Sequence, residues 1–505
     1  MAIDRRDLSA LALSAGLVLV GRLLSTFSKL AERIIIGRAF SPGTYGEVSI
    51  ALAILSFAVT ISLVGFNQGV PRYVARFDDG RDIRGTWFVG MVLAGGMSVL
   101  LALAIVLNGG FLRRTLLDGA VSPALLVVFA AAIPFVVGLR VAIGGIRGLE
   151  NTRYKVIAND VLYPGLRIAV LVVLLSLGVG VLAPAYAYLV AAAVAVVVAH
   201  LLLNRLVRLV GAVRTHSREL VAFSVPLVLS SIFADLLTYT DTVMLGFFRP
   251  SYQVGLYSAA YPLATSLLVV LSSFGYLYLP LASRLDAQDK RGEVADIYQL
   301  SSKWTFILTF PAFLALLAFP GDVLTIAFSA EYRPAAAALT ILTVGFFTNA
   351  AVGRNRETLS ALGYSRGVLL SNAVAFAANV VLNLALIPRY GFVGAAAASA
   401  TSFVMFNAVV YAILRRRYDI TPFSRYTRRT FVVLPAVLIP VTLGLARVMT
   451  LDLVTLVGFL VVAGVATLVL VAASGCLQPE DRVAIQLVEE RLGVTVPFIR
   501  RYLPE

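Results

Sequence analysis

Long apolar segments follow one another along the whole chain, separated by short polar stretches. Each is close to the roughly 20 residues that an α-helix needs to cross the hydrocarbon core of a bilayer. The pattern predicts an all-α polytopic membrane protein with about fourteen transmembrane helices. The predicted spans cover residues 9–31, 46–68, 86–108, 122–139, 157–179, 182–203, 219–247, 254–281, 304–328, 335–353, 367–387, 392–414, 430–446 and 453–474.

The composition excludes a soluble protein. The 505 residues are 59% hydrophobic and 14% charged, and the mean hydropathy is +0.90. Soluble domains carry about 25% charged residues, and no soluble fold could bury so much apolar surface. No polar stretch is long enough for a separate soluble domain.

The positive charges indicate how the spans are oriented. The net charge is +15, and the basic residues gather in every second loop, beginning with the N-terminal segment. Basic loops remain on the cytoplasmic side of a membrane. We therefore predict a multi-pass protein of the cell membrane with both termini in the cytoplasm. Because the charges lie in short loops between spans, they do not indicate a nucleic-acid partner.

The residues needed for catalysis or for metal binding are scarce. One Cys rules out an internal disulfide, and two His with one Cys argue against a metal site. The sequence holds no Ser/His/Asp set and no nucleotide-binding P-loop. The outer loops are too short for the catalytic domain of a glycosyltransferase, polymerase or ligase. We predict a protein that is not an enzyme and needs no cofactor.

An internal repeat links the ends of the first and seventh predicted spans. Each copy begins with an acid, three further residues, an aliphatic residue and Gly. A turn containing Pro comes next, and a second Gly opens the following span. The two acids lie near the outer helix ends and are predicted to be structural, through caps or pairs with nearby Arg. Matching residues lie 209 positions apart: Glu32 and Asp241, Gly37 and Gly246, Gly46 and Gly255, Ser49 and Ser258, Ala51 and Ala260.

Six spans precede the second copy, so both halves have the same orientation. Such parallel repeats are related by an axis along the membrane normal and hold a substrate path at their interface. We predict two six-helix lobes around a central cavity, over residues 1–210 and 211–418. Two additional helices follow over 419–476. The tail, 477–505, is predicted to be cytoplasmic, either as an amphipathic surface helix or as a frayed polar segment.

Three basic residues share one face of the first predicted span. Arg22, Lys29 and Arg33 are spaced by seven and four residues, which keeps them within about 40° at 100° per residue. Thr26 lies at the edge of this face. A charge at membrane depth costs about 2.5–3.5 kcal/mol on insertion scales and usually faces a cavity or a partner. The face predicts an anion path, unless Lys29 and Arg33 extend to the outer interface and only Arg22 is buried.

The seventh predicted span carries an acid at a corresponding position. Asp235 shares a face with Tyr239 and matches Thr26 through the repeat. Two interpretations are open. Asp235 is a counter-ion or an H+ or Na+ coupling site facing the basic residues, or it forms a static ion pair with Arg22.

Polar residues on two further spans also allow two interpretations each. Asp160 and Arg167 share a face of the fifth span and pair with each other or with neighbours, or they line the cavity. Asn379 and Asn383 on the eleventh span lie on one face, with Asn372 seven residues before Asn379. Their amides can hydrogen-bond sugar hydroxyls or can join helices to one another.

Several segments resemble polysaccharide flippases. The sequence NLALIPRYG over residues 383–391, with GAA at 394–396, is similar to the junction of spans 11 and 12 in Wzx-type exporters of the multidrug/oligosaccharidyl-lipid/polysaccharide exporter superfamily. The segments 32–46, 148–151 and 241–255 resemble their counterparts there. The resemblance implies alternating access on a polyprenyl-linked oligosaccharide. It also implies cationic cavity residues that hold the lipid phosphate, a role that Arg22, Lys29 and Arg33 match.

The sequence therefore predicts a flippase that carries a lipid-linked saccharide from the cytoplasmic to the outer leaflet. Its predicted partners are polyprenyl phosphate or diphosphate saccharides, membrane lipids, and H+ or Na+ as the coupling ion, and the protein is expected to be a monomer. The alternative is a cation-coupled multidrug antiporter of the same superfamily, which would favour an acidic, aromatic cavity.

Overall fold

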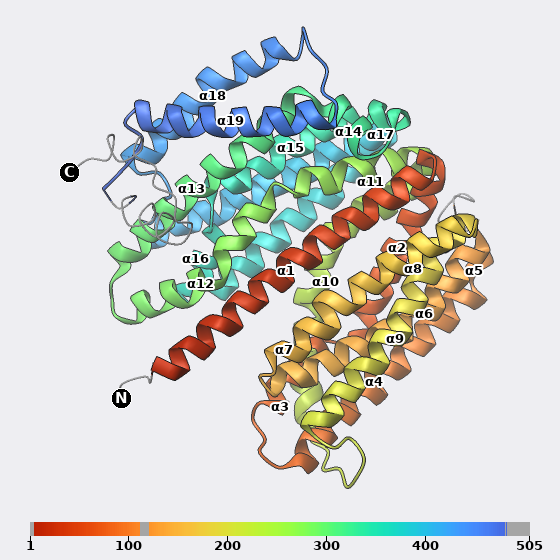
Figure 1. The fold of residues 1–505 in the computed structure, drawn as a ribbon. Coiled ribbons are helices and arrows are strands. Elements are labelled where there is room, and N and C mark those ends of the chain that lie inside the picture. Colours follow the sequence, from red (N-terminus) through yellow and green to blue (C-terminus); the bar gives the residue numbers. More distant parts are fainter. Residues whose placement is uncertain (1–4, 112–120, 480, 482–505) are drawn as a thin grey trace. The chain divides into compact units, whose positions relative to one another are not determined.

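The computed structural model describes residues 5–111, 121–479 and 481, and every regular element within them is a helix (Figure 1). Ten of the helices searched in this part are long and apolar enough to cross a membrane. The polytopic all-α fold is thus confirmed, whereas the count of fourteen spans remains a prediction. One of the ten, α17 (Ser365–Tyr418), covers two predicted spans. These are two helical segments joined by a kink at Gly391, where the backbone leaves the helical conformation.

Contacts divide the chain into two compact units. Unit 1 contains Met1–Ala259 and Leu382–Ala395, and unit 2 contains Ala260–Val381 and Ala396–Glu505. These units are defined by contacts alone. The two six-helix lobes defined by the repeat remain a prediction.

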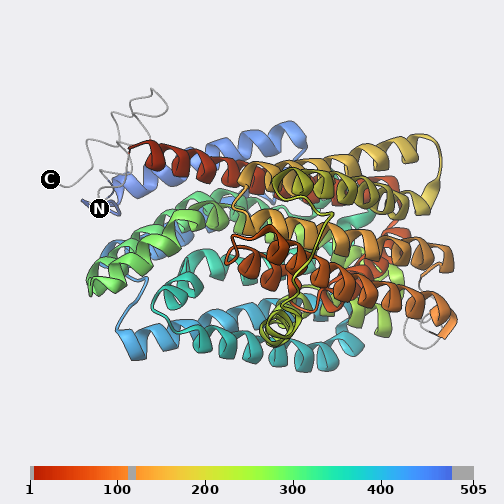
Figure 2. The same ribbon diagram turned by 90° about the horizontal axis from the view of Figure 1, so that it is seen from below.

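Unit 1 is built around α6, which packs against both α4 and α9 (Figures 1 and 2). The α6–α9 contact is close because small residues face each other there. Buried alanines recur every fourth residue of α9 from Ala187 to Ala199, and a side chain at Gly138 or Gly145 of α6 would press on α9. Small residues let membrane helices approach closely and gain van der Waals contact.

The elements of unit 1 are α1 (Arg5–Ala39), α2 (Pro42–Leu63), α3 (Phe66–Val74), α4 (Gly80–Leu107), α5 (Gly109–Phe111), α6 (Pro123–Gly148), α7 (Thr152–Lys155), the π-helix η2 (Val156–Leu162), α8 (Tyr163–Ser176), the 3-10 helix η3 (Gly180–Leu182), α9 (Ala183–Leu206), α10 (Ser217–Phe248) and the first part of α11 (Ser251–Thr265).

Unit 2 packs around α13, which contacts α12, α15, α18 and α19. Its elements are α12 (Leu268–Ala287), α13 (Arg291–Ala318), α14 (Pro320–Ala327), the 3-10 helix η4 (Ala330–Ala335), α15 (Ala336–Val352), α16 (Asn355–Ala361), α18 (Arg425–Leu445) and α19 (Leu453–Ala473), with most of α17.

Residues 46–68 are divided between α2 and α3, and two further predicted spans are broken in the structure. Residues 254–281 form α11 and α12 rather than one helix, and residues 304–328 are divided between α13 and α14. The break between α13 and α14 lies at Pro320, which has no N–H to donate to the helix and disfavours the helical conformation at the preceding Phe319.

The link between the two repeats is fastened to the start of α4. Asp82 accepts a hydrogen bond from His216 Nε2 at 3.0 Å and one from Arg214 at 3.4 Å. Arg84 donates to the carbonyl oxygens of Ala212 and Arg208 at 3.0 and 3.1 Å. This segment is therefore a folded part of unit 1.

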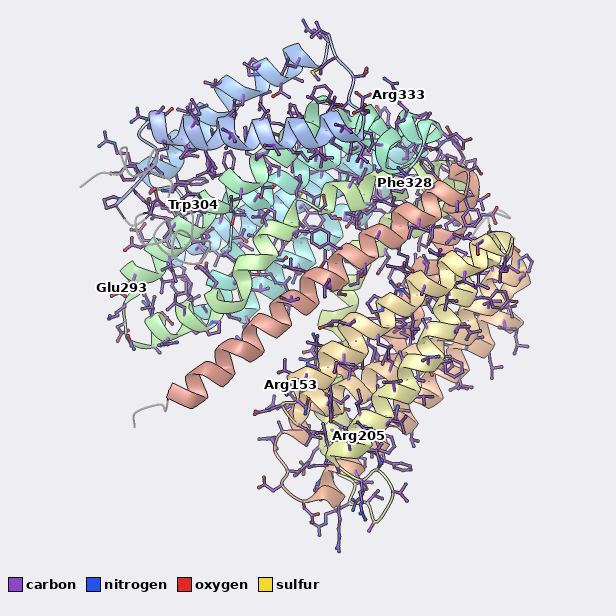
Figure 3. The ribbon with its side chains drawn as sticks, in the orientation of Figure 1. Arg153, Arg205, Glu293, Trp304, Phe328 and Arg333 are labelled. Atoms are coloured by element: carbon purple, nitrogen blue, oxygen red, sulfur yellow. The ribbon has the colours of Figure 1, made fainter. Side chains whose placement is uncertain are left out.

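The basic loops of unit 1 gather at the end where this link lies. Figure 3 shows Arg153, at the start of α7, and Arg205, at the end of α9, at the same end of the unit. In unit 2, Glu293 lies at the opposite end of the unit from Phe328 and Arg333 (Figure 3). Both observations match helices that run the full length of their unit.

A buried ion pair attaches the segment after α19 to α13. Lys303 Nζ lies 2.5 Å from Asp481 Oδ2, and both side chains are fully buried. The same carboxylate accepts hydrogen bonds from Trp304 Nε1 at 2.7 Å and from the backbone N–H of Gln478 at 2.8 Å. Lys303 lies directly before the predicted span 304–328 in the sequence. It lies inside α13, which begins twelve residues earlier, because hydropathy locates apolar segments and not helix ends.

We expect Asp481→Ala to destabilise unit 2, because Lys303 would remain buried without its carboxylate. Breaking a buried pair in this way costs about 3–5 kcal/mol. The thermal midpoint of the detergent-purified protein should fall clearly, and the double variant Lys303→Met/Asp481→Leu should recover most of the loss.

The matched control is Glu293→Ala, which removes the half-exposed Lys290–Glu293 pair on the same helix. Exposed pairs contribute about 0–1 kcal/mol, so its midpoint should stay near wild type. If Asp481→Ala behaved like this control, the ion pair would have no part in holding the C-terminal segment.

Candidate functional site

The two repeat-related acids each tie the first span of their half to the fifth. Glu32, on α1, pairs with Arg167 of α8. Asp241, on α10, accepts a hydrogen bond at 2.6 Å from Asn383 Nδ2 of α17. Both contacts lie within unit 1. The prediction that these acids are structural is consistent with both contacts, although one partner is an amide and not an Arg.

The Glu32–Arg167 pair is buried and surrounded by aromatic rings. The Glu32 side chain is 4% exposed and that of Arg167 is 8% exposed. The guanidinium lies 4.3 Å from the ring centroid of Tyr188 and 5.0 Å from that of Tyr163. Ring faces attract a cation, more strongly where water is excluded. The arrangement holds a positive charge at membrane depth with three partners.

Further basic residues surround this pair. Arg33 makes a hydrogen bond with Tyr45 and lies beside Tyr188 and Tyr239. Lys29, one turn before Arg33 on the same face of α1, is exposed and lies within electrostatic reach of Arg140 and Arg167. We define the basic cluster as Lys29, Arg33, Arg140 and Arg167.

Two acidic residues, Glu32 and Asp160, lie within electrostatic reach of Lys29. Each already has a basic partner: Glu32 pairs with Arg167, and Asp160 binds Lys155 at 2.5 Å. An excess of positive charge on a wall of membrane helices suits an anionic ligand, because such charges are retained where they face a partner or a substrate.

A π-helix places Asp160 beside α1. Residues Val156–Leu162 form the π-helix η2, a rare element that often marks functional sites. A Cβ at Gly21 would lie 3.0 Å from Asp160 Oδ2, so the glycine lets the carboxylate approach α1. Asp160 and Arg167 therefore pair with neighbours and not with each other.

The second acid is held by neutral donors. Asp241 accepts a second hydrogen bond at 2.6 Å from the Tyr257 hydroxyl, and Asp241, Tyr257 and Asn383 are at most 1% exposed. Charge-assisted hydrogen bonds of this length are about twice as strong as neutral ones. They join α10, α11 and α17 inside unit 1.

The segment that resembled flippases in sequence packs on the turn after α10. Arg249 donates to the carbonyl oxygens of Ile387 and Pro388 at 3.3 and 2.5 Å. Gln253 Oε1 accepts a hydrogen bond from the backbone N–H of Phe392 at 3.2 Å. A side chain at Gly391, where φ is +57°, would collide with Gln253. The motif thus positions a junction of helices.

The other predicted site residues are distributed as follows. Thr26 is exposed on α1, and Tyr239 packs edge-on against Phe57 with centroids 6.0 Å apart. Asn379 is buried in the unit 2 part of α17. The backbone at Arg22 and Asp235 is helical, but their side chains lie outside the described residues. Substrate binding by all of these residues, and by Lys29, Arg33 and Asn383, remains a prediction.

Four members of the arrangement, Arg140, Tyr45, Tyr163 and Tyr188, were not predicted as site residues. Arg140 lies just beyond the predicted span 122–139, whereas α6 continues to Gly148. The three tyrosines are among 20 in the chain, and none has a distinctive spacing. An alternative assignment of helix ends could have indicated Arg140, but no local pattern indicates the tyrosines.

A family model described as polysaccharide biosynthesis protein matches residues 13–286, more than half of the chain. The chain belongs to this family. Membership confirms the resemblance drawn from the repeat junctions, and it identifies a multi-pass membrane protein connected with polysaccharide biosynthesis.

Two relatives from Haloferax volcanii carry flippase names. The probable flippase AglR is 23% identical over 424 residues, which are 82% of this chain and 86% of AglR. The probable low-salt glycan biosynthesis flippase Agl15 is 26% identical over 200 residues. That second match spans only 42% of the length of Agl15 and 39% of this chain.

Solved structures show the same fold at low identity. The lipid II flippase MurJ, in an inward closed conformation, has a TM-score of 0.72 and 11% identity, covering 90% of this chain and 98% of MurJ. A multidrug resistance MATE family transporter, in an inward-facing conformation, has a TM-score of 0.64 and 17% identity, covering 78% of this chain and 94% of that one.

We expect the Asp241–Asn383 contact to tolerate exchange of its two residues but not change of either one. Asn383→Asp places two carboxylates about 2.6 Å apart, and Asp241→Asn removes the charged acceptor. A lost buried hydrogen bond to a charged group costs about 1.5–3 kcal/mol. The double variant Asp241→Asn/Asn383→Asp restores one amide facing one carboxylate. Thermal midpoints in detergent should fall for both single variants and recover in the double variant; equal midpoints for all three would contradict the prediction.

Proposed function

We propose that this family member is a flippase that moves a lipid-linked saccharide from the cytoplasmic to the outer leaflet by alternating access. The observation that carries the proposal is the basic cluster, in which cations outnumber carboxylates on apolar helices of unit 1. A lipid carrier joined to a saccharide through phosphate or diphosphate supplies the matching anion. The flippase names of AglR and Agl15 support the same class of substrate.

The cluster assigns separate roles to its members. Arg167 is neutralised by Glu32 and enclosed by tyrosines, so it orders the wall. Lys29 is exposed, and Arg33 is half-buried one turn away, so these two are the side chains that contact the lipid phosphate. Charge-assisted hydrogen bonds from such groups to phosphate are among the strongest that proteins make. Arg22 would extend the same face.

The proposal also includes the finer features predicted from the sequence. The two repeats form six-helix lobes around a central cavity, over residues 1–210 and 211–418, with both termini in the cytoplasm and the protein in the cell membrane as a monomer. Asp235 binds the coupling ion, H+ or Na+. The basic loops collected at one end of unit 1 support this orientation (Figure 3).

The proposal is tested with purified protein in liposomes that contain a defined polyprenyl-diphosphate saccharide on one leaflet. Lys29→Ala or Arg33→Ala should lower the flipping rate by about tenfold or more, because each removes a charged donor worth about 1.5–3 kcal/mol. The control Arg447→Ala removes an exposed Arg outside the cluster and should flip at the wild-type rate.

Two results would contradict the proposal. Wild-type protein might leave the saccharide lipid on its original leaflet, or the cluster variants might flip as fast as Arg447→Ala. Deletion of the gene gives an independent test, since loss of drug resistance with normal surface glycans would favour the multidrug antiporter.

A further inference from the structure

The repeat brings two glycines into reciprocal contact. Gly46 opens the second predicted span and Gly255 the eighth, and they are repeat equivalents, as are Pro42 and Ser251. A Cβ added to Gly46 would lie well inside 3.0 Å of the Ser251 carbonyl oxygen. A Cβ added to Gly255 would meet the Pro42 carbonyl oxygen equally closely. Real Cβ atoms essentially never approach so near.

This contact has twofold symmetry. The repeat matches Gly46 with Gly255 and Ser251 with Pro42. If the two halves are exchanged, the contact of Gly46 with Ser251 therefore becomes the contact of Gly255 with Pro42. An isologous interface has the same property, because the same patch is used on both sides. All four residues belong to unit 1. We define the glycine junction as these four residues with Tyr45 and Ser258, whose buried hydrogen bond, from the Tyr45 hydroxyl to the Ser258 carbonyl at 3.2 Å, adds to the contact.

The junction contains no charged side chain. The contact includes backbone packing, which depends on the missing Cβ atoms, and the hydrogen bond from Tyr45 to Ser258. Two strong polar contacts nearby lie within one half each: Glu32 with Arg167 in the first, and Asp241 with Asn383 in the second. The halves can therefore separate at the junction without breaking an ion pair in hydrocarbon, where exposed charges are costly.

The junction also lies at a defined end of the path. It joins the turns after α1 and α10, whereas the basic loops and the link held by Asp82 lie at the other ends of these helices. The positive-inside rule assigns the junction end to the outer side of the membrane.

We propose that the glycine junction is the outer gate of the transport path, closed in this structure and separated when the saccharide leaves. The proposal rests on the proposed function, because a gate has meaning only for alternating access. Each glycine is required because any side chain holds the two turns apart.

The first test measures closure directly, without a transport substrate. An ideal Cβ at Gly43 lies 4.0 Å from Ser251 Oγ, so thiols at these two positions would face each other across the junction. The variant Gly43→Cys/Ser251→Cys is made with Cys476→Ala. The native Cys476 is buried, and burial raises the pKa of its thiol, so it is a poor nucleophile. Copper phenanthroline should oxidise the two new thiols to a disulfide, and a thiol reductant should reverse it.

The second test adds Gly46→Ala or Gly255→Ala to this cysteine pair. We expect about a tenfold fall in the initial cross-linking rate, the result of a tenfold smaller closed population. Labelling of a single cysteine at Ser251→Cys by an impermeant maleimide from outside should rise. The matched control is Gly95→Ala on α4, where an added Cβ has nothing within 4 Å, and it should leave both rates unchanged.

Transport completes the comparison. The oxidised cysteine pair should stop flipping, and reduction should restore it. Cross-linking in Gly46→Ala and Gly255→Ala at the rate of Gly95→Ala would overturn the gate, as would undiminished flipping by the disulfide-bonded protein. If the glycine variants do not fold, the cysteine pair in the otherwise native chain still tests the gate, through the effect of the disulfide on flipping. If the junction opens and closes but no saccharide lipid moves, the proposed function fails while the gate stands.

Discussion

The cost of a charge in hydrocarbon governs the internal structure of this protein. A lipid core offers no water to a carboxylate or a guanidinium, so each one that lies at membrane depth must find a partner or face a cavity. Glu32 has Arg167 and Asp160 has Lys155. These pairs fix which helices lie together. Arg167, for example, can be buried only where α8 lies beside α1.

The two halves satisfy this constraint in different ways. In the first half the repeat acid is paired with a full positive charge, and further cations surround it. In the second half the equivalent acid, Asp241, is held by an amide and a phenol. A duplicated framework has thus kept the position of the acid and changed its surroundings.

Close packing explains the geometry that the two halves share at the ends of their spans. Where two turns meet at Gly46 and Gly255, the backbone itself makes the contact, and no side chain could be accommodated. Gly391 also makes a close contact that needs a glycine. Its backbone is left-handed, and the missing side chain leaves room for Gln253. Polar pairs hold helices of the same half together, while the glycine junction joins the halves through contacts that can separate.

Local pattern alone determined the class of fold, because a span needs only a run of apolar residues and helix geometry is periodic. It therefore located the long helices, the repeat with its acids and glycines, and the shared face of Lys29 and Arg33. Hydropathy did not locate the helix ends, so Arg140 and Lys303 fall just outside the predicted spans 122–139 and 304–328 although both lie inside helices. The partners of these charged side chains could not be predicted from local pattern. Arg167 and Glu32, like Lys303 and Asp481, are separated by more than a hundred residues. Only the folded chain decides such pairs, because packing and not sequence distance brings their side chains within hydrogen-bonding range.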